Sequence, residues 1–258
     1  MIDLAGRVAL IPGASGGIGR EVARLFAEYG CDVALAYHSR EAPARAVLDH
    51  ARGLNRRARL DRVDTSDFAD ARRWVEAVLR EFGRIDILAS CIGAHLPDGF
   101  SLFIKQDPAT WRAIIDAQLM SFIYLCRPVA EHMLERKSGR IMALGSDGGK
   151  VGESGLAVPN AGNAGMIGFA KSLAREVGRY GITANVVCPG PTEGPTLDTW
   201  RSEGDAGKRL VEEMIRRVPM KRLCTARDIA GAMAFLASAD AGYITGQAIS
   251  VSGGLVMN

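Results

Sequence analysis

The sequence predicts an α/β fold in which a parallel sheet is covered by helices on both faces. Short apolar runs alternate with segments of helical periodicity along the whole chain. This alternation is typical of a doubly wound parallel sheet, because each crossover helix packs back onto the sheet. The chain has no internal repeat and no Pro/Gly-rich linker, so we expect one domain over residues 1–258.

The elements follow from these runs in order along the chain. We expect buried strands at residues 7–11, 32–37, 85–89, 140–144, 182–187 and 248–251, and a weaker strand at 57–63. Helical periodicity indicates helices at residues 18–29, 41–53, 68–82, 108–136, 160–180 and 226–238. Residues 189 to about 205 are irregular, with a helix-like run through 217, and are rich in Gly, Pro and Thr. Such a segment after a late strand favours a substrate lid at about residues 190–220.

The composition is that of a soluble globular protein, with 48% hydrophobic and 24% charged residues among 258. The formal net charge is 32 minus 29, or +3, and the basic residues are scattered, so we expect no nucleic-acid partner. Five cysteines lie far apart without a CxxC pair, which is typical of buried thiols in a reducing compartment, and we expect no metal site. No leader precedes the first strand, so we expect a cytoplasmic protein that does not span a membrane.

A glycine-rich turn lies between the first predicted strand and the first predicted helix. There, backbone N–H groups can approach a pyrophosphate, and the helix N-terminus adds a favourable field. A purely structural tight turn is the alternative, but the strand–turn–helix context favours dinucleotide binding in a Rossmann-type sheet. We expect Gly13, Gly17 and Gly19 to line the pyrophosphate, and Ser15 and Ile18 of the same turn to contact the cofactor.

This turn resembles the GxxxGxG motif of the short-chain dehydrogenase/reductase family, and the resemblance covers nearly the whole chain. Residues 83–88, 185–190 and 243–247 resemble further family motifs in the family's order. The resemblance implies a sheet of about seven strands, a nicotinamide dinucleotide, a small-molecule substrate and, in most members, a homotetramer. It also implies cofactor contacts in the later turns and loops, at Asp64 beside the adenine and at Gly93, Pro189, Gly190 and Thr192, with Thr196 as a further lid candidate.

The end of the second strand indicates which dinucleotide binds. An acidic residue there would bind both ribose hydroxyls, but this chain carries Ser39 and Arg40, which suit a 2′-phosphate. We therefore favour NADP(H) over NAD(H). Gly16, where many NADP-preferring members carry arginine, argues in the other direction. The plain alternative is that Ser39 caps the next helix while Arg40 is solvated.

The family's proton-donating pair is missing. Family chemistry uses a tyrosine and a lysine four residues apart, together with a serine; the lysine lowers the tyrosine pKa. Ser146 matches the serine, whereas Pro159 and Asn163 stand at the tyrosine and lysine positions. Proline has no proton to give and asparagine carries no charge. Gln118 also replaces the family's asparagine, while Ser90, Cys91 and Pro12 depart from the motifs around the cofactor.

Four residues near Ser146 or the fourth strand are candidates to replace the pair, although each has a plain reading as a solvated charge or strand-end residue. They are His95, Asp147, Lys150 and Glu153. The segment at Pro159 and Asn160 likewise has a plain reading, as a proline and a capping residue near a helix start.

We therefore expect an NADP(H)-dependent oxidoreductase that transfers hydride to a small carbonyl or enoyl substrate by a non-standard proton route. The alternative is a catalytically impaired member that acts as a cofactor sensor or partner subunit; a lyase or isomerase is a third possibility. Small residues on one helix allow close helix approach in a homotetramer, or else packing against the sheet and cofactor: Ala161, Gly162, Ala164, Gly165 and Gly168.

Overall fold

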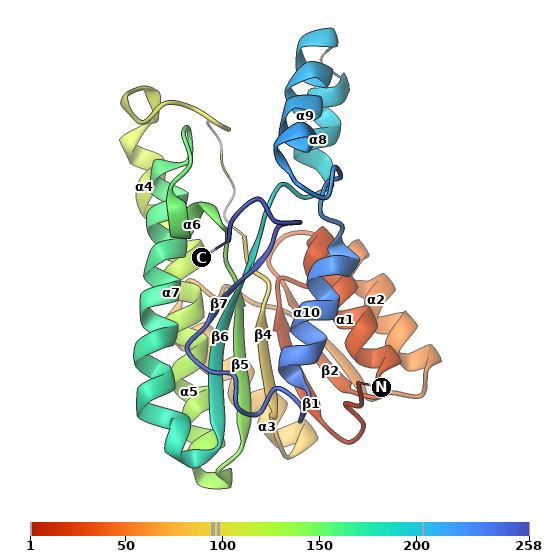
Figure 1. Cartoon of the computed structure of the whole chain (residues 1–258). Helices are drawn as coiled ribbons and strands as arrows, with labels where there is room; N and C mark the ends of the chain where they lie inside the picture. Colours follow the sequence, from red (N-terminus) through yellow and green to blue (C-terminus); the bar gives the residue numbers. More distant parts are fainter. Residues whose placement is uncertain (1, 94–95, 97–98, 203, 258) are drawn as a thin grey trace.

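The computed structural model describes residues 2–93, 96, 99–202 and 204–257. Its centre is a seven-stranded parallel sheet with the order β3-β2-β1-β4-β5-β6-β7 (Figure 1). The strands are β1 (Val8–Pro12), β2 (Asp32–Tyr37), β3 (Ala58–Arg62), β4 (Ile87–Ser90), β5 (Gly139–Leu144), β6 (Ile182–Pro189) and β7 (Ala248–Val251). The order confirms the predicted doubly wound, Rossmann-type sheet. It also places a topological switch point between β1 and β4, where such sheets bind ligands.

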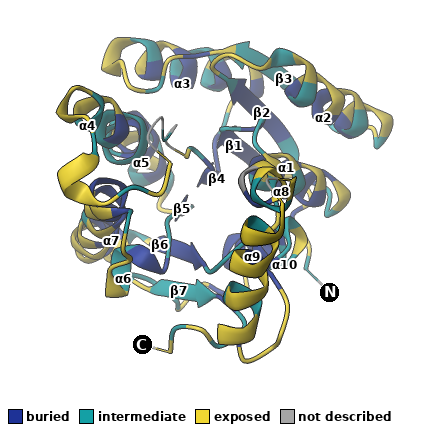
Figure 2. Cartoon of the chain, turned by 90° about the horizontal axis from the view of Figure 1, so that it is seen from above, coloured by how far each residue is buried: buried dark blue, intermediate teal, exposed yellow. Residues whose placement is uncertain are grey.

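Helices cover both faces of the sheet (Figure 2). One layer holds α1 (Gly17–Glu28), α2 (Glu41–Gly53) and α10 (Ala226–Ala237); the other holds α3 (Phe68–Phe82), α5 (Ser121–Arg136) and α7 (Ala157–Val177). Strand β1 shows why both layers form. Its alternate residues are buried on opposite faces, with Ala9 and Ile11 in one core and Val8 and Leu10 in the other. Because both faces of this strand are buried, its sequence is a continuous apolar run.

The helix predicted over residues 108–136 is interrupted in the structure. It divides into α4 (Pro108–Ile115), a π-helical turn (Asp116–Met120) and α5. Helix α7 packs against this turn, since a Cβ atom at Gly165 would lie 2.8 Å from Leu119 Cδ2 and one at Gly162 would lie 2.9 Å from Gln118 Oε1. These two glycines thus serve a close helix contact within the chain. Periodicity alone does not reveal a single π turn, which adds one residue to an otherwise regular helix.

The run Pro108–Arg136 is long and apolar enough to cross a membrane by length and composition. Core helices of soluble proteins pass the same test, and 44% of its most apolar window is buried. Phe122, Leu125 and Val129 of this run are completely buried in the same core cluster as Trp74 of α3. The run therefore packs largely as a core helix. All five cysteines are free and buried, as the sequence predicts.

Helix α7 begins three residues earlier than the predicted start at residue 160. Its N-cap residue is Leu156, and no side chain caps this end. The interpretation of Asn160 as a capping residue is therefore wrong, because Asn160 lies inside the first turn. Pro159 is the third helical residue, where its missing N–H deprives the helix of no hydrogen bond. The interpretation of Pro159 as a proline near the helix start is confirmed.

The stretch expected to be irregular after β6 contains a helix, α8 (Pro195–Ser202), which is followed by α9 (Asp205–Arg217). The two helices form a hairpin that projects above the sheet (Figure 1). Leu197 of α8, Val211 of α9 and Leu223 bury one another in a separate small core, against which Trp200 also packs. Packing between the two helices thus stabilises a segment whose local composition favours a loop.

In the turn between β1 and α1, two glycines lie in very close contact with carbonyl groups of the backbone. Gly13 has a φ of +80°, and a Cβ atom there would lie 2.4 Å from the carbonyl oxygen of Cys91, after β4. A Cβ atom at Gly19 would lie 2.2 Å from the carbonyl oxygen of Gly13. Gly17 differs, because a Cβ atom there would meet nothing within 4 Å. Gly13 and Gly19 are therefore required by the turn itself, whereas Gly17 faces open space.

Gly13→Ala should lower the free energy of unfolding by more than the ~1–2 kcal/mol that a left-handed backbone costs a residue with a Cβ atom, because the methyl group also collides with Cys91. Gly83→Ala is the matched control, since Gly83 has a φ of +77° and open space around it. Urea denaturation of both variants measures the difference. Equal losses would contradict the importance of the Cys91 contact.

Candidate functional site

Two cavities lie where loops leave the carboxyl ends of the strands, the edge that Figure 2 views from above. A cavity of about 160 Å³ is bounded by the turns after β1, β2 and β4 and by the residues after β3. A larger cavity of about 500 Å³ lies between the segment after β5, the segment after β6 and the α8–α9 hairpin. We call them the turn cavity and the Ser146 cavity. Both occupy the position expected for ligand sites in an open parallel sheet.

The N-terminus of α1 presents unused backbone donors beside the turn cavity. Among the described residues, no acceptor is bonded to the N–H groups of Ser15, Gly17 and Ile18, no side chain caps the helix, and its first turn holds no acidic residue. The open space at Gly17 lets a ligand approach these donors closely. A helix N-terminus with free N–H groups suits an anion, so this turn fits the pyrophosphate of a dinucleotide.

The end of β2 carries the charges that discriminate between dinucleotides. Arg40 and His38 line the turn cavity, and Arg40 has no ion-pair partner among the described residues. The nearby Glu41 is engaged, because it pairs with Arg45 and accepts a 2.9 Å hydrogen bond from the Tyr37 hydroxyl. These contacts lower the pKa of Glu41, with Arg45 as the main cause. The basic group is thus the one left available to a ligand.

Ser39 does not have the capping role offered as its plain alternative. The N-cap residue of α2 is Arg40, and no side chain caps that helix. Ser39 itself is exposed and lies next to the cavity rather than in its wall. The structure therefore brings Arg40 to the cavity and leaves Ser39 at its margin.

The far wall of the turn cavity is formed by the residues that follow β3 and β4. Val63, Thr65 and Gly93 line it. Asp64 lies beside them on the exposed turn, and its Oδ1 accepts hydrogen bonds from the Ser66 N–H at 3.0 Å and from the Ser66 hydroxyl at 2.5 Å. These bonds lower the pKa of Asp64, so the carboxylate is ionised and held in one orientation.

Ser146 and the first lid residues meet in the Ser146 cavity. The Ser146 Oγ accepts a 3.1 Å hydrogen bond from the Gly148 N–H, so its own proton remains available to a ligand. Pro189, Gly190 and Thr192 line the same cavity, and the Thr192 hydroxyl donates to the Gly190 carbonyl oxygen at 2.8 Å. Of the other candidates, Thr196 lies on α8, and His95 lies outside the described residues.

Pro159 and Asn163, which the sequence predicts to stand at the positions of the proton-donating pair, lie on α7, and neither is titratable. Pro159 is buried and lines a cavity of only about 10 Å³ with Leu96 and Ile114, rather than the Ser146 cavity. Asn163 is buried beside Gly149, whose added Cβ atom would lie 2.6 Å from Asn163 Cβ. Gln118 lies in the π-helical turn, and its Oε1 is buried without a partner among the described residues.

A charged network behind Ser146 includes a residue that sequence reasoning missed. Asp147 Oδ1 accepts a 2.6 Å hydrogen bond from the hydroxyl of Ser250 on β7, and this hydroxyl accepts a 2.8 Å bond from Lys150 Nζ. Ser250 is about a hundred residues from both partners in sequence, so no local spacing reveals the contact. The only signal in the sequence is a serine in an otherwise apolar strand.

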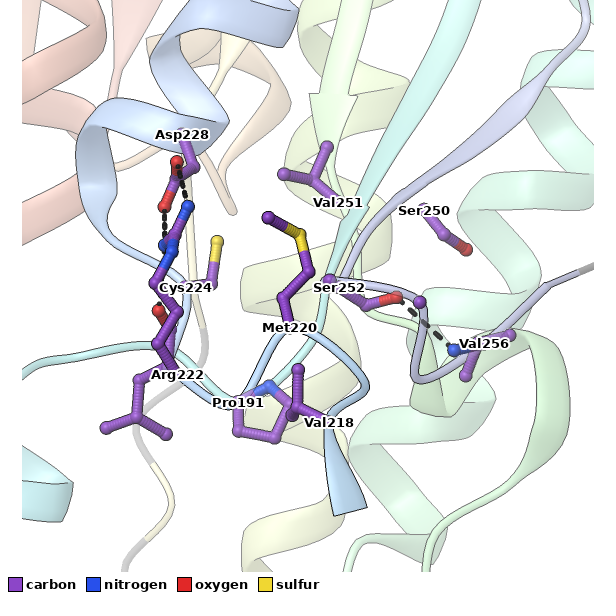
Figure 3. Close-up of a pocket in the computed structure, with 13 residues that line it drawn as sticks. Pro191, Val218, Met220, Arg222, Cys224, Asp228, Ser250, Val251, Ser252 and Val256 are labelled. Carbon is purple, nitrogen blue, oxygen red and sulfur yellow. Dashed lines mark hydrogen bonds and ion pairs between the residues drawn. The ribbon is translucent and has the colours of Figure 1, made fainter. Parts of the chain in front are cut away.

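A third cavity, of about 530 Å³, adjoins the Ser146 cavity and shares Pro191 and Val256 with it (Figure 3). Its charged side chains face each other rather than the hollow, since Arg222 Nη1 lies 2.6 Å from Asp228 Oδ2 (Figure 3). The Ser252 hydroxyl accepts a 3.3 Å bond from the Val256 N–H. Much of the remaining wall is apolar, so the groups suited to chemistry are those of the Ser146 cavity.

Comparison with known proteins agrees with this architecture. A family model described as enoyl-(acyl carrier protein) reductase matches residues 13–256. The 3-oxoacyl-(acyl-carrier-protein) reductase FabG of Escherichia coli (strain K12) is 37% identical over 256 residues, which cover 99% of this chain and 100% of the relative. The acetoacetyl-CoA reductase of Allochromatium vinosum is 36% identical over 253 residues, covering 98% and 99%.

The FabG of Staphylococcus aureus (strain Mu50) is 34% identical over 249 residues, which cover 96% of this chain and 98% of the relative. Identity at this level over nearly complete chains accompanies the seven-stranded parallel sheet and its glycine-rich turn. The chain therefore belongs to the short-chain dehydrogenase/reductase family.

Proposed function

We propose that this chain is an NADP(H)-dependent reductase of a small carbonyl or enoyl substrate, which it reduces without the family's tyrosine–lysine pair. The observation that carries the proposal is the pairing of the two cavities at one edge of the sheet. One offers free backbone donors and an unpaired Arg40, and the other offers the free hydroxyl proton of Ser146. The first suits a dinucleotide and the second suits a substrate oxygen.

The cofactor would be held by groups with separate tasks. The N–H groups of Ser15, Gly17 and Ile18 bind the pyrophosphate. Gly13 and Gly19 shape the turn, because their backbone contacts leave no room for a side chain. Asp64 and Gly93 border the adenosine, while Pro189, Gly190 and Thr192 border the nicotinamide. Arg40 favours NADP(H), because an unpaired guanidinium can form charge-assisted bonds to a 2′-phosphate.

The substrate class follows from the relatives and from the cavity. The names of the relatives specify 3-oxoacyl and acetoacetyl thioesters, and the matching family model is named for enoyl thioester reduction. Leu156, Leu197 and Met214 give the Ser146 cavity an apolar wall that suits a short acyl chain. A bound NADPH would supply hydride. Ser146 would donate a hydrogen bond to the substrate oxygen, in an orientation fixed by the Gly148 N–H.

The second candidate function is a cofactor-binding sensor or partner subunit with little activity of its own. It is favoured by the position of Pro159, which has no proton to give and lines a different and much smaller cavity. The two functions share the same cofactor contacts. They differ in whether the pure protein oxidises NADPH when it is offered a substrate.

Several organisational features remain predictions. We propose one domain over residues 1–258, with the α8–α9 hairpin as the lid of the Ser146 cavity, since Leu197 and Met214 of the hairpin line that cavity. A homotetramer and a cytoplasmic location are also proposed. The exposed Ala161, Ala164 and Gly168 on α7 support close helix association between subunits.

Gly17→Val should abolish calorimetric binding of NADPH while leaving the fold intact, because its side chain enters open space above the N–H groups of α1. Gly178→Val is the matched control, since Gly178 also faces open space but lies far along the chain, after α7. Undiminished affinity in the Gly17 variant would exclude the α1 turn as the pyrophosphate site.

Arg40→Ala should weaken NADPH binding by about tenfold, through loss of a charge-assisted hydrogen bond, and leave NADH binding nearly unchanged. Calorimetry with both dinucleotides measures the ratio. Arg80→Ala, which removes an exposed arginine from α3, is the control for net charge. Equal weakening of both dinucleotides would remove the phosphate role of Arg40.

Ser146→Ala should reduce kcat for NADPH oxidation by about 10²–10³-fold, because one donor to the developing oxyanion is lost. Acetoacetyl-CoA and an enoyl-CoA are the substrates, and calorimetry checks that NADPH affinity is retained. Ser172→Ala, on the exposed side of α7, should behave as wild type. A wild type that binds NADPH but turns over neither substrate would contradict the reductase and favour the sensor or subunit.

A further inference from the structure

Two carboxyl groups share the wall of the Ser146 cavity. Asp147 directly follows Ser146, and Glu153 follows the short helix α6 (Gly148–Val151). Much of the remaining wall is apolar. Asp147 is buried and Glu153 is exposed, so the two carboxyl groups meet the cavity in different environments, which is a recurring arrangement in acid–base chemistry.

The first carboxyl group is fixed and incompletely satisfied. Asp147 is only 4% exposed, and its Oδ1 is held by the Ser250 hydroxyl, which is itself held by Lys150. Its Oδ2 is buried and has no hydrogen-bond partner among the described residues. Burying a carboxylate oxygen without a hydrogen bond is costly. A hydrogen bond donated to Asp147 Oδ2 by a ligand, or by a protonated second carboxyl group, would remove this cost.

The second carboxyl group is held by no side chain. Among the described residues, Glu153 has no ion pair or side-chain hydrogen bond. Desolvation against the cavity, followed by repulsion from Asp147, raises the pKa of Glu153. Among the described residues, the other charged groups around this cavity are Asp147, Lys150 behind it and Arg217 from α9. Of the two carboxyl groups that line the cavity with Ser146, Glu153 is thus the one whose surroundings favour the protonated form. Asp147 is instead anchored through Ser250 to Lys150.

We propose that Glu153 is the proton donor of this active site, with Asp147 as a positioning residue whose charge keeps the proton on Glu153. The inference rests on the proposed reductase function. Reduction of a carbonyl breaks its C=O π bond and forms one C–H and one O–H bond. A bound NADPH would supply the hydride. The carboxyl group of Glu153 would supply the proton, become a carboxylate and recover a proton from solvent water at the cavity mouth. Ser146 holds the oxygen during this transfer.

The arrangement accounts for the loss of the tyrosine–lysine pair. In the pair, a cation lowers the pKa of a phenol towards neutrality. Here desolvation, and then the neighbouring carboxylate of Asp147, raise the pKa of a carboxylic acid, so that this acid keeps its proton to a higher pH than a free glutamate does. Position 163 carries the uncharged Asn163, and the cation near Ser146 is Lys150, which reaches Asp147 through Ser250.

Glu153→Gln keeps the shape of the side chain but removes its acid, and it should lower kcat by about 10²–10⁴-fold with acetoacetyl-CoA. KM and the affinity for NADPH should stay unchanged. Glu212→Gln, an exposed residue of α9, is the matched control and should retain full activity. A Glu153→Gln variant within about threefold of wild-type kcat would overturn the proposal. A wild type without turnover would instead overturn the reductase function itself.

The positioning role is tested by pH, because only protonated Glu153 can donate. Activity should fall as pH rises through the pKa of Glu153. Asp147→Asn removes the repelling charge and lowers that pKa, so the fall should begin at a lower pH; thermal melting checks that the variant is folded.

A readout independent of turnover is carboxyl ¹³C NMR of the cofactor-free protein, where the signal missing in Glu153→Gln identifies Glu153. We expect it to titrate above the usual range for glutamate, and at lower pH in Asp147→Asn. A titration in the usual range, or one unmoved by Asp147→Asn, would overturn the carboxyl pair.

Discussion

The close approach of three backbone segments at the switch point between β1 and β4 is the constraint on which the site depends. The carbonyl oxygen of Cys91 touches the Cα side of Gly13, and the carbonyl oxygen of Gly13 touches Gly19. Side chains at either glycine would push β4 or α1 away from β1. Because both glycines permit the contact, the N-terminus of α1 reaches the edge of the sheet with its N–H groups free. The turn cavity therefore follows from backbone packing more than from its side chains.

The two halves of the site use charge in different ways. In the turn cavity, Glu41 is neutralised by Arg45, which leaves Arg40 as an unpaired positive group at the surface. Such a group provides affinity for an anion with little cost in stability. In the Ser146 cavity, Asp147 is buried and its charge is compensated through Ser250 and Lys150. A buried network of this kind is costly to break, and it holds its members in one geometry.

The α8–α9 hairpin has its own small core and few contacts with the sheet helices. One contact with the opposite rim is aromatic, since the rings of Phe100 and Trp200 lie 4.9 Å apart, edge to face. Leu223, which follows the hairpin in the chain, belongs to the same core, so the hairpin also packs on the segment that leads to α10. Phe100 and Leu197 both line the Ser146 cavity, so the hairpin and the opposite rim each form part of its wall.

The sequence by itself determined the sheet, the helix layers and the position of the glycine-rich turn, because apolar periodicity and glycine spacing are local signals. It also shows that positions 159 and 163 carry a proline and an asparagine, neither of which is titratable. Only the tertiary structure decided how the remaining groups meet. The π turn at Gln118 arises from packing against α7, α8 forms by burial against α9, and Ser250 joins Asp147 to Lys150 across about a hundred residues. Such contacts depend on which segments the fold brings together, and no local pattern records that.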